Sequence, residues 1–149
     1  MGELKLNLVG TYLTKWDQEN VPGAGIQDCA GTWDRGTCGP PTPELRYNFR
    51  ASWVTPWDAT ITGTVRYIDE VTEAVFDGSN NRTDGPTTLS DQYYLDLAAT
   101  WNVLDSTQLR LGVNNVFDKE PPLLPGAPAG SANGNAYPNY DMLGRYIFM

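Results

Sequence analysis

The sequence predicts an all-β fold, an antiparallel up-and-down meander of about six strands. Three observations predict it: a composition that breaks helices, a period-two alternation of apolar and polar residues, and connections that are short and long in turn. Gly, Pro, Asn and Asp supply 49 of the 149 residues, and Val, Ile and Thr supply 28. This mixture favours twisted strands joined by turns. No stretch approaches the roughly 18 consecutive apolar residues of a spanning helix.

The first three strands are expected at residues 4–16, 45–53 and 59–67, where successive residues alternate in polarity. In the first, the apolar parity runs from Leu4 to Trp16, and the opposite parity carries lysines. In the second and third, the polar parity consists of Arg46, Asn48, Arg50 and Ser52, then Thr60, Thr62, Thr64 and Arg66. Each strand therefore has one apolar and one polar face.

The last three strands are expected at residues 93–102, 108–117 and 140–148. The fourth and fifth alternate cleanly. The sixth puts Tyr140, Met142, Gly144, Tyr146 and Phe148 on the apolar parity. Its polar parity is less clean, because Leu143 and Ile147 interrupt it.

The connections between these strands alternate in length. Turns near residues 56–58 and 104–106 are tight, whereas the connections at about 17–43, 69–91 and 118–139 each exceed 20 residues. Three such loops are unusual in a compact soluble domain. They are typical of a transmembrane β-barrel, whose strands run between short periplasmic turns and long outer loops. The lengths therefore favour a membrane barrel, with these three segments as its outer loops.

Aromatic residues gather at both ends of the apolar parity, as in the girdles of a membrane barrel. The expected outer rim holds Tyr12, Trp16, Tyr47, Tyr67, Tyr93, Phe117 and Tyr140, and the periplasmic rim holds Trp53, Trp57, Trp101 and Phe148. Five of the seven arginines lie on the opposite parity and are candidates to face the lumen: Arg46, Arg50, Arg66, Arg110 and Arg145. The alternative is a secreted soluble β-sandwich, such as a carbohydrate-binding module, in which the aromatics form the core.

Charge and composition exclude several functions. The chain has 10 basic and 18 acidic residues, a net charge of −8, and no histidine. A general nucleic-acid surface needs an excess of Lys and Arg, so nucleic acid is not an expected partner. Catalysis by an imidazole and metal binding through an imidazole are therefore excluded. We expect no enzyme activity, no metal and no cofactor.

The two cysteines, Cys29 and Cys38, lie in a segment rich in turn formers, and the pattern favours a loop disulfide. Two free thiols, or half of a metal site, are the alternatives. A disulfide places the loop in an oxidising compartment, yet residues 1–8 alternate in polarity and carry Glu3, unlike a signal peptide. We therefore expect a fragment of an exported protein. Six strands are too few to form a transporter barrel.

Residues 109–122 read Leu-Arg-Leu-Gly-Val-Asn-Asn-Val-Phe-Asp-Lys-Glu-Pro-Pro, and a Gly-Arg pair follows near the end of the chain. With the strands before them, these residues resemble the C-terminal end of the TonB-dependent outer-membrane receptors. The residues that carry the family motif are Asn114, Asn115, Phe117, Asp118, Gly144 and Arg145.

The resemblance implies that residues 1–149 are the last six strands of a 22-stranded barrel in the bacterial outer membrane. The plug domain and earlier strands have no counterpart in this sequence. Such receptors take up a large, scarce ligand, such as an iron-siderophore complex, cobalamin or an oligosaccharide. The implied partners are the rest of the barrel, its plug, the TonB system acting through the missing N-terminal part, and lipid or lipopolysaccharide. The transported ligand is not identified.

Two aromatic residues in the long loops are candidates to contact a ligand. Trp33, between the cysteines, and Tyr137, in the last loop, have rings that can stack on a sugar or an aromatic siderophore. The alternative is that they pack the loops together.

Overall fold

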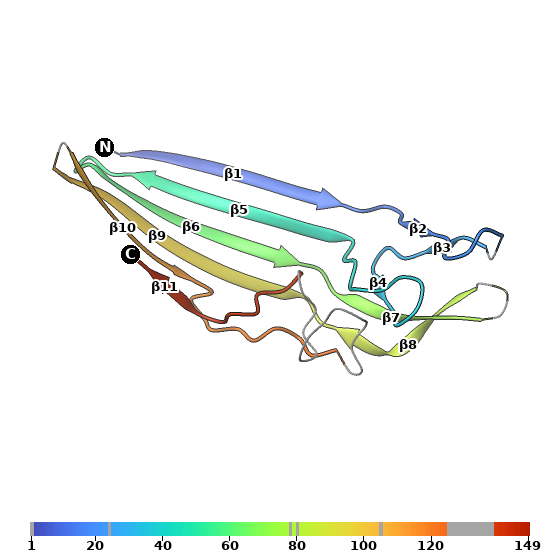
Figure 1. The fold of residues 1–149 in the computed structure, drawn as a ribbon. Helices are drawn as coiled ribbons and strands as arrows, with labels where there is room; N and C mark the ends of the chain where they lie inside the picture. The colour runs from blue at the N-terminus through green and yellow to red at the C-terminus, as the bar shows by residue number, and fades with distance from the viewer. Residues whose placement is uncertain (1, 24, 78, 80, 105, 125–138) are drawn as a thin grey trace.

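The computed structural model describes residues 2–23, 25–77, 79, 81–104, 106–124 and 139–149, and it is all-β in this part of the chain. One sheet of six strands, in the order β1-β5-β6-β9-β10-β11, dominates the fold (Figure 1). All neighbours in it are antiparallel. Its strands are β1 (Glu3–Tyr12), β5 (Leu45–Val54), β6 (Ala59–Ile68), β9 (Gln92–Leu104), β10 (Thr107–Asn114) and β11 (Tyr146–Phe148). No described helix is long and apolar enough to cross a membrane.

The six-stranded sheet confirms the predicted meander. Five of its strands overlap the expected segments, and each pairs with the next predicted strand along the chain. Two end earlier than expected: β1 ends at Tyr12 and not at residue 16, and β10 ends at Asn114 and not at residue 117. The sheet is open, with β1 at one edge and β11 at the other. A barrel of 22 strands would therefore need many strands besides these six.

Two of the three long connections are not irregular loops, because they contain short strands of their own. Residues 17–43 contain β2 (Asp17–Gln18), β3 (Gln27–Asp28) and β4 (Thr32–Trp33), and residues 69–91 contain β7 (Val71–Phe76) and β8 (Arg82–Leu89). β2 pairs with β3, while β4 runs parallel to β7, which pairs with β8. We call these five short strands the cap; they gather at the end of the sheet opposite the start of β1 (Figure 1).

The buried core lies where the cap meets the long strands. It consists of Trp33, Ile68, Val71, Leu89, Tyr94, Leu124 and Tyr140. The expectation that Tyr140 starts the sixth strand on an outer apolar rim is wrong, because Tyr140 is 4% exposed and β11 begins only at Tyr146. Burial raises the pKa of the Tyr140 hydroxyl.

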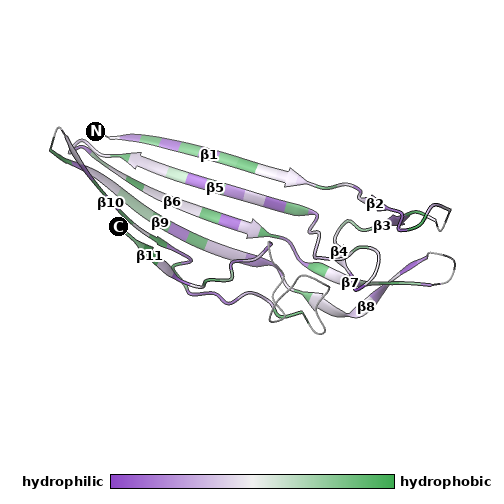
Figure 2. Cartoon of the chain, in the orientation of Figure 1, coloured by the Kyte–Doolittle hydropathy of each residue, from purple (hydrophilic) through white to green (hydrophobic). Residues whose placement is uncertain are grey.

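The six-stranded sheet has two unlike faces, as its alternating hydropathy shows (Figure 2). Residues paired across strands share a face. The apolar face carries Leu4, Leu6, Leu8, Tyr47, Phe49, Trp53, Ile61, Val65, Tyr67, Tyr93, Leu97, Trp101, Leu109 and Leu111. The polar face carries Lys5, Asn7, Arg46, Asn48, Arg50, Ser52, Thr62, Thr64, Arg66, Tyr94, Asp96, Thr100, Arg110 and Asn114.

Most of the apolar face is exposed, with Phe49 at 38% and Leu8 at 67%, whereas Tyr47, Val65 and Tyr67 are half-buried. Its aromatics cluster as predicted. Tyr47, Tyr67 and Tyr93 form a ladder at the cap end, with ring centroids 4.9 and 4.6 Å apart. At the other end, Trp53 meets Trp57 edge to face, with centroids 5.6 Å apart.

The face assignment of the sixth strand is wrong. β11 pairs with β10 so that Phe148 lies opposite Gly112 and Tyr146 opposite Asn114, which places both rings on the polar face. Ile147, expected among the polar positions, lies on the apolar face opposite Val113. The reason is steric: the Phe148 ring fills the space that a Cβ at position 112 would occupy. An aromatic ring over a cross-strand glycine covers the exposed backbone there.

Gly112→Ala is expected to lower the free energy of unfolding by about 1 kcal/mol, because the new methyl group displaces the Phe148 ring and weakens the β10–β11 pairing. Urea titration followed by tryptophan fluorescence measures the loss. Gly63→Ala is the matched control, since a Cβ there meets only Leu97 Cδ2, at 3.5 Å. Equal losses in the two variants would contradict the role of the Phe148 ring.

Candidate functional site: the polar face and the cap

The polar face contains an open groove of about 380 Å³. Its polar lining consists of Asn48, Arg50, Ser52, Thr62, Thr64, Arg66, Asp96, Thr100, Arg110 and Asn114. The Ser52 and Thr62 hydroxyls are hydrogen-bonded across β5 and β6 at 3.0 Å. The groove therefore presents hydroxyl, amide and guanidinium groups together.

The structure brings three of the five predicted arginines to this groove, namely Arg50, Arg66 and Arg110. Arg46 shares their face but lies nearer the cap, where its Nη2 donates to Asn139 Oδ1 at 2.9 Å. Arg145 lies just before β11 and does not line the groove; its Nη2 is 3.8 Å from Asp118 Oδ2. Its expected place on a regular sixth strand is wrong, because β11 has only three residues.

Arg66 is the centre of a polar network at the cap end of the groove. Its Nε donates to Asp96 Oδ2 at 2.6 Å, and its Nη2 donates to Asp96 Oδ1 at 3.0 Å and to Asp141 Oδ2 at 2.8 Å. The guanidinium also stacks on the Tyr94 ring, 4.9 Å from its centroid. Bidentate, charge-assisted contacts of this kind are among the strongest polar interactions in proteins. Arg66 is therefore held in one orientation by strand β9 and by the last segment of the chain.

The network also holds the start of the last long connection. The buried Asn115 N–H donates to Asp96 Oδ1 at 2.8 Å. Asn115 adopts a φ of 51°, which Asn tolerates better than most residues. Its side chain closes a ring with Lys119, donating to that carbonyl and accepting from that N–H, both at 2.9 Å. The Asn115 motif position thus builds the turn that ends β10.

A second motif contact joins this turn to the segment before β11. Asp118 Oδ1 accepts the Arg145 N–H at 2.7 Å. Gly144 has a φ of 65°, and a Cβ there would lie 2.9 Å from the same Asp118 oxygen, so only glycine fits. Phe117 is 74% exposed and takes no part in the contact. Asn114 lines the groove.

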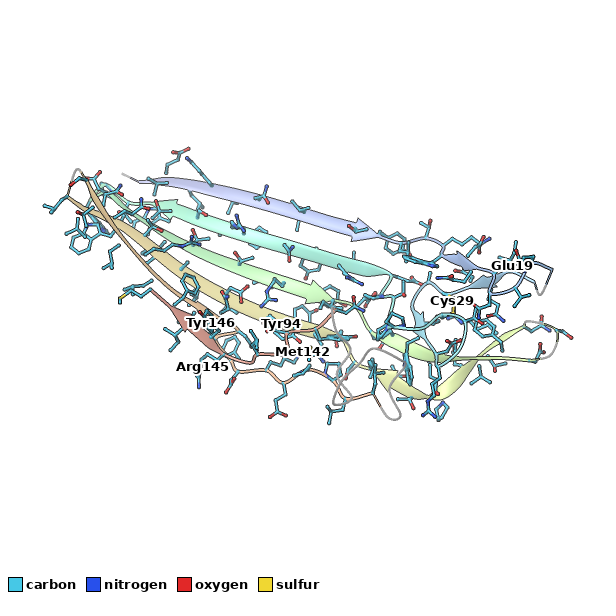
Figure 3. All side chains as sticks on the ribbon, viewed as in Figure 1. Glu19, Cys29, Tyr94, Met142, Arg145 and Tyr146 are labelled. Atoms are coloured by element: carbon cyan, nitrogen blue, oxygen red, sulfur yellow. A yellow bond between two sulfur atoms is a disulfide. The ribbon has the colours of Figure 1, made fainter. Side chains whose placement is uncertain are left out.

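Sequence reasoning missed Tyr94, Asp96 and Asp141 as site residues. The signal was present, because Tyr94 and Asp96 share the polar parity of β9, and Arg66 lies directly opposite Tyr94. Figure 3 shows Tyr94 on β9 and Met142 in the neighbouring final segment. Asp141 carries no such signal, since the segment that contains it is irregular.

The cap is organised around the predicted disulfide, which the structure contains: Cys29 and Cys38 are bonded, with their Cα atoms 5.3 Å apart (Figure 3). Asp34 lies inside the closed loop, and its Oδ1 accepts N–H groups from Gly36, Cys38 and Gly39 at 2.8 to 3.0 Å. β4 lies inside the same loop, and the carbonyl of Gly31, just before β4, accepts a hydrogen bond from the Thr72 N–H at 3.1 Å. The disulfide therefore anchors the strand that joins the two long connections.

Replacing both cysteines by serine is expected to lower the free energy of unfolding of the cap by about 2.5 to 3 kcal/mol, through the added freedom of the unfolded loop. Hydrogen exchange of the β4 and β7 amides measures it. Adding a reductant to the unaltered chain should reproduce the effect and should leave the double variant unchanged. Full protection of β4 and β7 in the variant would contradict the anchoring role.

The structure corrects the expectation that Trp33 contacts a ligand. Trp33 is 0% exposed and packs in the core, because β4, within the disulfide loop, is held against β7. The packing alternative accounts for it. Tyr137, the other candidate, lies outside the described residues.

Two carboxylates stabilise turns in the cap region. Asp28 accepts the Trp16 and Ala30 N–H groups, and these bonds, the Trp16 bond foremost, lower its pKa. Asp77 accepts the Asn81 and Ser79 N–H groups and the Asn81 side-chain amide, which lower its pKa. Both carboxylates therefore stay ionised to a lower pH in the folded chain than in the unfolded one.

Acidification is expected to loosen these two turns first. A carboxylate whose folded pKa lies below its unfolded value, about 3.9, adds stability above that value and loses it as the pH falls through the folded pKa. Exchange of the Trp16, Ala30 and Asn81 amides, corrected for the intrinsic rate, should speed up below about pH 4. Asp28→Asn is the control and should remove the pH dependence at Trp16 and Ala30 only. If these three amides stay equally protected from exchange down to pH 2, the two carboxylates do not stabilise the turns.

Two further findings bear on function. Among the residues that the structure describes, no group of three or more Cys, Asp or Glu side chains lies close enough together to hold a metal ion. Comparisons with known protein families, with curated proteins and with solved structures found no match.

Proposed function

We propose that the chain forms six adjacent strands of a transmembrane β-barrel in the bacterial outer membrane, as the C-terminal part of a TonB-dependent receptor. Such a receptor would take up a large, scarce ligand, such as an iron-siderophore complex, cobalamin or an oligosaccharide. The observation that carries the proposal is the two-faced sheet, with an exposed apolar face and a polar face that forms a groove. It is a transport role without covalent chemistry.

The apolar face supports a membrane environment. β1, β5 and β6 have ten residues each, within the length of about 9 to 11 residues that a tilted strand needs to cross a bilayer. The tyrosine ladder and the Trp53–Trp57 pair lie at opposite ends of this face, where the two membrane interfaces would be. Exposed apolar surface of this extent is rare on soluble monomers.

A soluble β-sandwich would cover the apolar face with a second sheet. In the described ranges, the two other sheets belong to the cap, and the buried core lies beneath them. Nothing in this part of the chain favours the secreted carbohydrate-binding alternative.

The open edges of the sheet support a larger barrel. In a bilayer each unpaired backbone group costs several kcal/mol, so β1 and β11 would each need a further strand. In the proposal, the rest of the barrel supplies these strands, a plug domain occupies part of the lumen, and TonB acts through the N-terminal part of the receptor. Lipid and lipopolysaccharide would contact the apolar face.

Fractionation of the source cells tests the proposal, with an antibody raised against the denatured chain, which detects boiled and unboiled bands alike. The expected result is signal in the outer-membrane fraction, in a heat-modifiable band that migrates faster when it is not boiled. A signal confined to the soluble or secreted fraction would sink the receptor proposal and favour the sandwich.

A further inference from the structure

The charged residues of the six-stranded sheet are mostly basic, whereas those of the rest of the chain are mostly acidic. These strands carry five basic residues and two acidic ones, all on the polar face: Lys5, Arg46, Arg50, Arg66 and Arg110, with Glu3 and Asp96. The remaining residues carry five basic and 16 acidic side chains. The polar face is therefore a positive surface on a chain whose net charge is −8.

Among the described residues, pairing leaves three of these charges without a carboxylate partner: Arg46, which donates to Asn139 nearer the cap, and the groove residues Arg50 and Arg110. Lys5 has Glu3 at 3.4 Å, and Arg66 has two carboxylates. Across the described ranges, Arg50 and Arg110 have no carboxylate within ion-pairing distance, although both line the groove. Arg110 lies over the Phe148 ring, 5.5 Å from its centroid, which leaves its N–H groups free to donate.

The floor between the two arginines is rich in neutral hydrogen-bonding groups. Thr62, Thr64 and Thr100 come from β6 and β9, and Ser52 and Asn114 flank them. Guanidinium groups bind carboxylate and phosphate oxygens in a bidentate manner, and hydroxyl and amide groups bind neutral oxygens. A hollow lined by one sign of charge concentrates solutes of the opposite sign.

We infer that the groove is a binding site for a solute that carries several carboxylate or phosphate groups, with Arg50 and Arg110 as its two anchors. The inference rests on the proposed function in one respect, because it makes the polar face the lumen wall along which the solute passes. The site itself is defined by the positive charge of this face. Arg66 also lines the groove, but Asp96 and Asp141 already pair with its charge.

Arginine modification tests the site. Phenylglyoxal labelling of the full chain, in isolated membranes and after detergent extraction, is read at each arginine by mass spectrometry. Tricarballylate, a tricarboxylate, and pyrophosphate are the two anionic probes, and sorbitol is the neutral one. We expect phenylglyoxal to label Arg50 and Arg110, and one or both anionic probes to slow this labelling without slowing that of Arg145. Sorbitol should slow the labelling of none of them. The two anions distinguish a carboxylate from a phosphate solute.

Variants test whether the two arginines act together. Arg50→Gln should raise the probe concentration that half-protects Arg110 by about tenfold, the effect of losing one charge-assisted contact, and Arg110→Gln should do the same for Arg50. Lys15→Gln is the matched control, since this exposed lysine pairs with Asp17 away from the groove, and it should change nothing.

Two results would overturn the inference. The first is that the anions slow the labelling of Arg145 as much as that of Arg50 and Arg110, or that neither anion slows the labelling of any arginine. The second is labelling of Arg50 and Arg110 that is absent in untreated membranes and appears only after a urea wash. That result would show that a polypeptide covers the face. Fractionation is read separately: a soluble chain with anion-protected Arg50 and Arg110 would keep this site and sink the receptor proposal.

Discussion

Asp96→Ala is expected to lower the free energy of unfolding by about 2 to 3 kcal/mol. The substitution removes both Asp96 contacts to Arg66 and leaves that partly buried cation with Asp141 alone. It also removes the acceptor of the buried Asn115 N–H. The side chains are 32% and 19% exposed, so solvent screening keeps the loss below that of a fully buried pair. Urea titration in detergent or vesicles, followed by tryptophan fluorescence, measures it.

Two variants separate the contributions at Asp96. Asp96→Asn keeps an oxygen for the Asn115 N–H but loses the charge, so an intermediate loss is expected. Asp84→Ala is the control, because its side chain is 73% exposed and lies 3.9 Å from Arg82, and it should cost less than about 0.5 kcal/mol. If Asp96→Ala costs no more than Asp84→Ala, the network does not stabilise the fold.

Trp33→Ala is expected to destabilise the cap by about 3 to 5 kcal/mol, the usual cost of emptying a fully buried aromatic site. The loss should be local, because the core that contains Trp33 meets the six-stranded sheet only at its cap end, through Ile68 and Tyr94. Hydrogen exchange should therefore rise in β4, β7 and β8 while the β5–β6 pairing stays protected.

Trp33→Phe is the companion variant. Trp33 Nε1 is buried with no hydrogen-bond partner among the described residues, so losing the N–H carries little penalty and most of the packing is kept. A loss of less than about 1.5 kcal/mol is expected. Equal losses for Phe and Ala would show that the indole nitrogen, not the ring volume, holds the cap.

The long strands could be predicted because their alternation extends over ten residues and one parity is strongly apolar. Arg50, Arg66 and Arg110 were therefore placed on a common face from sequence alone. The sixth strand was misassigned because three residues are too few to define a parity, and the contact of Phe148 with Gly112 decides it instead. Three of the five cap strands escaped prediction for a similar reason, since β2, β3 and β4 have two residues each.

The Arg66 network could not be read from parity alone, because parity gives a face and not a register. Arg66 and Asp96 are 30 residues apart, and their contact depends on how β6 pairs with β9. Aligning Tyr67 with Tyr93 would have given that register, since these aromatics face each other across the two strands. The contact from Asp141 has no periodic signal and needs the fold itself.

The parallel pairing of β4 with β7 determines what can recognise this end of the molecule. The buried Thr32 and Trp33 lie beside Thr72 and Glu73, so segments about 40 positions apart are held together in the cap, and Arg82 reaches across to the Ala30 carbonyl at 3.2 Å. An epitope here is discontinuous. Antibodies raised against linear peptides from either segment will miss it, whereas those raised against the oxidised, folded chain will lose their target when the disulfide is reduced.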